Sequence, residues 1–136
     1  MRRLVIVAAS LALVGSSAMP AKAVDLEQKL FAQSLVDAEE MIALSIETAD
    51  FETLKDYEFR LSRQLGQVPV FDGLGLMCAF AAQSLLNITL DIKLPPARAV
   101  KAYDGNRRDF VAYMKDCAKY TGVRFKVQLP RSLARR

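Results

Sequence analysis

The chain has 136 residues, of which 52% are hydrophobic and 25% are charged, and it contains no histidine. The lack of histidine excludes Ser-His-Asp and Cys-His nucleophile systems, zinc sites with histidine ligands and the H-E-x-x-H signature. The formal net charge of +4 falls to +1 when the first 23 residues, with three basic residues and no acidic one, are set aside. Basicity therefore gives no argument for a nucleic-acid partner.

The first 23 residues have the pattern of a secretory signal peptide. Two arginines follow the first methionine, and residues 4–14 are apolar apart from one serine. Ala21-Lys22-Ala23 then places alanine at both positions that a signal peptidase inspects. We therefore expect a signal peptide over 1–23 and an exported protein, either periplasmic or secreted. Cleavage after Ala18, or retention as an N-terminal anchor, is the alternative.

An amphipathic helix is predicted from Asp25 to about Glu47. Apolar residues recur there at steps of three and four, as expected for one buried face of a helix. The predicted buried stripe consists of Leu26, Leu30, Phe31, Leu35, Ala38, Ile42 and Ile46. The acidic residues lie mainly off this stripe, so we expect them on a solvated outer face.

A second helix is predicted to run to about Leu65. Thr48 or Asp50 can cap its first turn, because a short oxygen-bearing side chain accepts a hydrogen bond from a free N–H there. Gly66 follows its last residue, as is usual at helix ends. The residues expected to be buried in this helix are Phe51, Leu54, Tyr57 or Phe59, Leu61 and Leu65.

The stretch from Gly73 to Leu94 carries no charge before Asp91. Its apolar residues follow a helical period and few polar residues oppose them, which predicts a central helix buried on most sides. A second interpretation is a transmembrane span, although the uncharged run is near the lower length limit. A third is a helix to about Leu86 followed by a strand, because residues 88–94 alternate between apolar and polar.

Pro95 and Pro96 end this element, because a proline lacks an N–H and fixes φ. Cys78 lies 17 positions before Pro95, and Cys117 lies 21 positions after Pro96. If both segments are helices, with a rise of about 1.5 Å per residue, the two sulfur atoms lie at nearly the same height of an antiparallel hairpin. Two cysteines in a small exported domain usually form a structural bridge. We therefore predict a Cys78–Cys117 disulfide, and prefer helix to strand over 88–94.

A short helical face is predicted over 97–103, followed by a turn at Asp104-Gly105-Asn106 and a final helix that ends at Gly122. Residues 123–129 alternate between apolar and polar, so we expect an extended segment that Pro130 ends. This segment can pack on its own domain or pair with the sheet edge of another protein.

These elements together predict an all-α domain over 24–130 with a basic tail over 131–136. The domain is a small bundle of four to five helices with a disulfide-linked helical hairpin and a short extended C-terminal segment. The alternative is an α+β fold with strands near 88–94 and 123–129.

Charge is distributed unevenly along the chain after the signal. Residues 24–60 carry a net charge of −7, and residues 61–136 carry +8. The two parts can pack against each other, or the basic part can form a surface for an anionic partner or a peripheral contact with an anionic membrane. In the second case the residues expected to bind the partner are Arg107, Arg108, Lys115, Lys119, Arg124, Phe125, Lys126 and Val127.

The sequence has no glycine-rich phosphate loop, no calcium loop and no C-x-x-C-H haem motif, so we predict no cofactor and no metal site. Paired carboxylates such as Asp37 with Glu40, or Asp56 with Glu52, resemble ordinary solvated charges. We therefore expect an accessory protein that binds a protein partner in the cell envelope, rather than an enzyme. The alternative is a small-ligand or lipid-binding module with a pocket lined by Met77, Phe80, Leu85, Phe110 and Met114.

Overall fold

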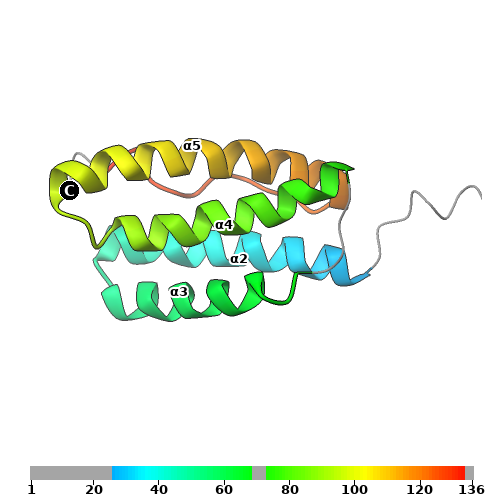
Figure 1. Cartoon of the computed structure of the whole chain (residues 1–136), viewed down its shortest axis with the longest axis horizontal. Coiled ribbons are helices and arrows are strands. Elements are labelled where there is room, and N and C mark those ends of the chain that lie inside the picture. Colours follow the sequence, from blue (N-terminus) through cyan, green and yellow to red (C-terminus); the bar gives the residue numbers. More distant parts are fainter. Residues whose placement is uncertain (1–25, 69–72, 134–136) are drawn as a thin grey trace, which may run out of the picture.

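The computed structural model describes residues 26–68 and 73–133, which form an antiparallel helical bundle followed by an extended segment (Figure 1). The helices are α2 (Leu26–Thr48), α3 (Phe51–Leu65), α4 (Leu76–Asp91) and α5 (Pro96–Thr121), and a 3-10 turn, η2 (Gly73–Gly75), leads into α4. The predicted all-α bundle is confirmed, and the described residues contain no strand. The predicted signal peptide and the last three residues of the basic tail lie outside the described ranges.

The α2–α3 turn follows the predicted capping chemistry. Asp50 is the N-cap of α3, since its carboxylate accepts hydrogen bonds from the Thr53 N–H at 3.1 Å and from the Thr53 hydroxyl at 2.7 Å. These bonds hold the pKa of Asp50 below its usual value. The helix ends at Leu65, as predicted, and Gly66 follows it with an ordinary right-handed backbone.

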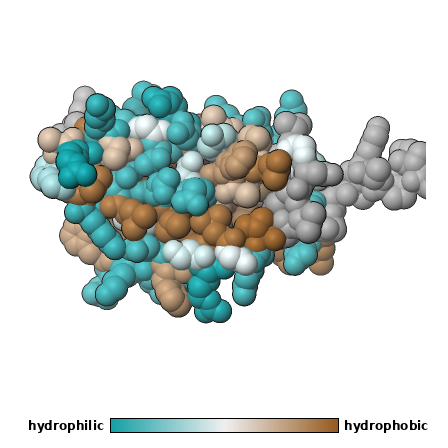
Figure 2. Space-filling model, viewed as in Figure 1, coloured by the Kyte–Doolittle hydropathy of each residue, from teal (hydrophilic) through white to brown (hydrophobic). Residues whose placement is uncertain are grey.

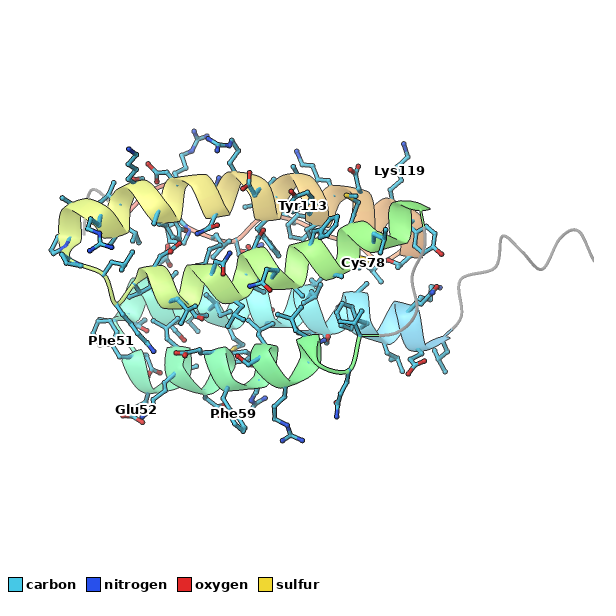
Figure 3. The ribbon with its side chains drawn as sticks, in the orientation of Figure 1. Phe51, Glu52, Phe59, Cys78, Tyr113 and Lys119 are labelled. Atoms are coloured by element: carbon cyan, nitrogen blue, oxygen red, sulfur yellow. A yellow bond between two sulfur atoms is a disulfide. The ribbon has the colours of Figure 1, made fainter. Side chains whose placement is uncertain are left out.

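The buried stripe of α2 differs from the prediction at its first two residues. Leu26 and Leu30 are 70% and 60% exposed, whereas Phe31, Leu35 and Ile42 are buried. Each residue of a helix lies about 100° from the one before it, so Leu30 cannot share the narrow buried face that Phe31 begins. Phe51 was likewise expected in the core, but it is 62% exposed because it is the first residue of α3, at the end of the bundle (Figure 3).

The predicted hairpin of α4 and α5 is present, and the two helices lie side by side (Figure 1). Cys78 and Cys117 form a disulfide with a Cα–Cα distance of 4.7 Å, and both residues are fully buried. Beside the disulfide, the rings of Phe80 and Tyr113 are 5.4 Å apart. Residues 88–91 belong to α4 and a turn follows them, so the strand alternative at 88–94 is wrong.

The predicted turn at Asp104-Gly105-Asn106 does not exist, because α5 is one unbroken helix. A glycine inside a helix costs only about 1 kcal/mol relative to alanine, and α5 packs along the whole of α4. Asn106 is used in this packing, since its side-chain N–H donates to the Asp91 carboxylate at 2.8 Å. Burial raises the pKa of Asp91, and the bond from Asn106 opposes this effect.

The central helix α4 is less enclosed than its composition predicts. Leu76, Phe80 and Leu90 are 43%, 44% and 40% exposed, and they share one face of the helix with Gln83 and Asn87. Figure 2 shows a hydrophobic band along the middle of this side of the molecule. The helix is therefore buried, as predicted, except along this one face.

None of the described helices combines the length and the hydropathy that a membrane span requires.

Residues 123–133, here called the C-terminal arm, are extended as predicted but pair with no strand. Gly122, which precedes the arm, reverses the chain at the end of α5 with a φ of 82°. The arm then runs back along α5, since Phe125 contacts Phe110 and Pro130 contacts Tyr103. Of the two arrangements that the sequence left open, packing on its own domain is the one observed.

Candidate interaction surface

Four basic residues of α5 lie on its solvent-facing side. Lys101, Arg108 and Lys115 recur at steps of seven, and Lys119 follows four residues later, so all four share one helix face. All four are exposed. Figure 3 shows Lys119 pointing away from the bundle. Lys101 was not among the residues expected to bind a partner, although its spacing of seven from Arg108 is visible in the sequence.

The arm adds further basic side chains beside α5. Arg124, Lys126 and Arg131 are exposed, whereas Phe125 and Val127, which alternate with them, are half-buried. We define the basic face as Lys101, Arg108, Lys115, Lys119, Arg124, Lys126 and Arg131. Residues 96–133, which contain this face, hold nine basic and three acidic residues, a net charge of +6.

The acidic helix α2 does not neutralise this charge. Within the described ranges, the ion pairs join Arg60 to Asp56, Lys93 to Glu58, and Arg108 to Asp109. Only the last involves the basic face, and its atoms are 3.8 Å apart between largely exposed side chains, a geometry that contributes little. Within the described ranges, no ion pair therefore joins an acidic residue of α2 to the basic face.

Three residues expected to bind a partner are occupied inside the molecule. The guanidinium of Arg107 donates to the Leu129 carbonyl, with an Nη2–O distance of 3.2 Å. Phe125 places its ring edge-on to Phe110, with 5.7 Å between centroids. Val127 packs against the core from the same side of the arm. The structure therefore places these three residues in the attachment of the arm and the other five on the surface.

Glu39 is the main anchor of the arm, and the sequence analysis assigned it to the solvated face of α2. It is 1% exposed, and its Oε2 accepts hydrogen bonds from two successive backbone N–H groups, those of Gln128 at 2.6 Å and Leu129 at 2.8 Å. The signal that could have found it is its position: Glu39 follows Leu35 by four residues and precedes Ile42 by three. An acidic residue within a buried stripe needs a partner.

Tyr103 completes the attachment. It is fully buried, and its hydroxyl donates to the Pro130 carbonyl at 2.6 Å. Burial raises the pKa of Tyr103 above its usual value, which keeps the hydroxyl protonated and able to donate. We call Glu39, Tyr103 and Arg107 the arm clamp.

Burial also raises the pKa of Glu39 above its ordinary value of 4.5. The two N–H groups that its carboxylate accepts from, and the nearby charge of Arg107, oppose this shift, while Glu40 adds to it. Burial therefore outweighs the donors, and the fold favours the protonated form of the Glu39 carboxyl more than water does.

The described residues contain no group of three or more cysteine, aspartate and glutamate side chains placed to hold a metal ion. Leu85, Phe110 and Met114, expected to line a ligand pocket, are fully buried in the core. An apolar hollow of about 270 Å³ lies at the end of the bundle instead, lined by Ile46, Phe51, Ile92, Leu94, Pro96, Ala99, Val100 and Leu133.

Comparison of the chain with protein-family models, with curated proteins and with solved structures finds no match.

Proposed function

We propose that this is an exported accessory protein of the cell envelope that binds an acidic surface of a protein partner through its basic face. The observation that carries the proposal is the set of exposed cations along α5 and the arm, of which Arg108 alone has an acidic partner within the described ranges. Unpaired charges of one sign steer an oppositely charged partner and speed its association.

Export is supported by the signal pattern over 1–23 and by the disulfide. Disulfides persist in the periplasm and outside the cell and are rare in the cytosol. A disulfide-locked bundle also offers a rigid support for the cations of α5, which limits the entropy lost when a partner binds.

The proposal can be tested by reversing charge on two faces in parallel. Lys115→Glu with Lys119→Glu changes the basic face by four charge units. Lys55→Glu with Arg63→Glu makes the same change on the exposed side of α3. Affinity capture from a cell-envelope extract should recover a partner with the wild type and the α3 variant, and lose it with the α5 variant or at high salt.

Vesicles distinguish the partner class. Cosedimentation with phosphatidylglycerol vesicles, against phosphatidylcholine vesicles, measures attraction to an anionic membrane. The proposal predicts capture of an acidic protein, with little vesicle binding at physiological salt. Equal capture by both charge variants would contradict it, and so would strong vesicle binding with no protein captured.

A further inference from the structure

Side chains of α2 and α5 bond to the backbone of the C-terminal arm, and we call the surface that they form the groove. Glu39 of α2 accepts the N–H groups of Gln128 and Leu129, and two residues of α5, Arg107 and Tyr103, donate to the next two carbonyls. The bound segment, residues 123–133, forms no helix and pairs with no strand of the described residues. The groove is thus a built site for an extended segment, and in this structure its own C-terminal arm fills it.

The contacts that position the arm come mainly from the bundle: Glu39, Tyr103 and Arg107 bond to its backbone, and Phe110 contacts Phe125. Within the arm, the Gln128 side chain donates to the Lys126 carbonyl at 3.5 Å, a long hydrogen bond. A hollow of about 230 Å³ lies between the arm and α2 and is lined by Val36, Glu39, Glu40, Arg124, Phe125, Lys126 and Gln128.

The connection between α5 and the arm is as short as a connection can be. The helix includes Thr121, the arm begins at Val123, and Gly122 alone makes the reversal with a φ of 82°. Residues other than glycine rarely adopt this left-handed backbone. Short hinges under conformational constraint favour the exchange of a terminal element between copies of a chain.

We propose that the groove also accepts the arm of a second copy of this chain, which gives a symmetric arm-exchanged dimer. In that dimer Gly122 leaves its left-handed conformation and the arm continues away from its own α5. Every contact of the clamp, and the contact of Phe125 with Phe110, re-forms between copies. The closed monomer and the dimer then differ mainly at residue 122, so concentration and the hinge decide between them. This inference does not depend on the basic face or on the proposed partner.

The hinge gives a direct test with a matched control. Gly122→Ala places a Cβ at the left-handed position and disfavours the closed monomer, and the Cβ causes no clash, since its nearest neighbour is Lys29 Cε at 3.9 Å, an ordinary van der Waals contact. Gly105→Ala makes the same chemical change inside α5, where the nearest neighbour is Arg108 Nη2, also at 3.9 Å. Light scattering over a concentration series should show dimerisation of Gly122→Ala at concentrations at least about tenfold lower than for the wild type. Gly105→Ala should follow the wild type.

The exchanged element can be identified in a mixed sample. Equal amounts of ¹³C-labelled and unlabelled Gly122→Ala protein are unfolded together, refolded and examined by isotope-filtered NMR. An intermolecular contact between the Phe125 ring and the Phe110 ring is expected. A dimer without this contact would overturn the proposal.

If the hinge variant does not fold, the wild type takes its place. It is refolded at about 1 mM, since a tethered segment competes at an effective concentration of that order. Wild-type protein or folded Gly122→Ala that stays monomeric under these conditions would equally overturn the proposal.

Discussion

The α4–α5 hairpin and the C-terminal arm are both fixed to the bundle, but by different means. The hairpin is joined by a disulfide between fully buried cysteines and by apolar side chains at helical spacing. The arm has no regular secondary structure and is fixed by three side chains that bond to its backbone. Repetitive local patterns determine the first attachment, and a few long-range polar contacts determine the second. The two should therefore respond differently to substitution.

Removal of the disulfide should have the largest effect. The two cysteines are 39 residues apart, and closing a loop of that length stabilises a fold by roughly 3–4 kcal/mol in the loop-entropy account. Urea unfolding of Cys78→Ala with Cys117→Ala should show a loss of this size in the free energy of unfolding. A loss below about 1 kcal/mol would mean that the packing of α4 on α5 suffices without the bridge.

Removal of the carboxylate that anchors the arm should come next. Glu39→Ala leaves the N–H groups of Gln128 and Leu129 without their acceptor, and a buried unpaired donor costs about 1–3 kcal/mol. We expect the free energy of unfolding to fall by about 2–3 kcal/mol, because Leu129 is buried while Gln128 can reach water. Glu40→Ala, on the exposed neighbour, should change it by less than about 0.5 kcal/mol. Equal effects of the two substitutions would show that the arm does not depend on Glu39.

A smaller effect is expected at the far end of the arm. Tyr103→Phe removes only the hydroxyl that donates to the Pro130 carbonyl, at a cost of about 1 kcal/mol. Tyr113→Phe is the control, because the Tyr113 ring contacts Phe80 and its hydroxyl forms no hydrogen bond within the part of the chain that the structure describes. Thermal unfolding of the two variants should place Tyr103→Phe clearly below Tyr113→Phe.

The pH dependence gives the finest comparison. Burial raises the pKa of Glu39 in the folded protein above its ordinary value of 4.5, which holds in the unfolded chain. At a pH between the unfolded-state pKa and the folded-state pKa, the folded state therefore binds more protons than the unfolded chain. The contribution of Glu39 to stability is then complete below about pH 4.5 and falls as the pH rises through the folded-state pKa.

Glu39→Gln lacks this titration and keeps an oxygen acceptor. The free energy of unfolding of the wild type minus that of Glu39→Gln should therefore decrease from about pH 4 to about pH 7. Asp91, whose pKa burial also raises, is present in both proteins and cancels. An increase of the difference with pH would contradict the assignment.

The hairpin could be predicted because the sequence shows what forms it: apolar residues at helical spacing, and two cysteines at similar distances on either side of the double proline. The double proline sets the reversal, and the spacing of Cys78 and Cys117 from it fixes the register of the two helices. The prediction of a turn at Gly105 was wrong because it considered only local sequence, whereas the packing that forms the hairpin also keeps α5 helical there. Packing along α4 outweighs the cost of about 1 kcal/mol for one glycine in a helix.

The course of the arm could be predicted only in part. Its alternating pattern showed that Phe125 and Val127 share a side, but not which surface would cover them. That surface includes Glu39, which is 89 residues before Gln128. By residue type alone, Glu39 cannot be told apart from the other acidic residues of α2. Pairing between a helical carboxylate and an extended backbone has no sequence period, so only the fold reveals it.

The central claim is that a buried carboxylate, rather than secondary structure, fixes the arm. Native-state hydrogen exchange at the Gln128 and Leu129 amides tests this claim most directly, with the exposed Lys126 in the same segment as an internal reference. We predict exchange at Gln128 and Leu129 on the order of 100-fold or more slower than in an unstructured peptide, and loss of this protection in Glu39→Ala, which removes the acceptor. Exchange of both amides at the unprotected rate in the wild type would contradict the account.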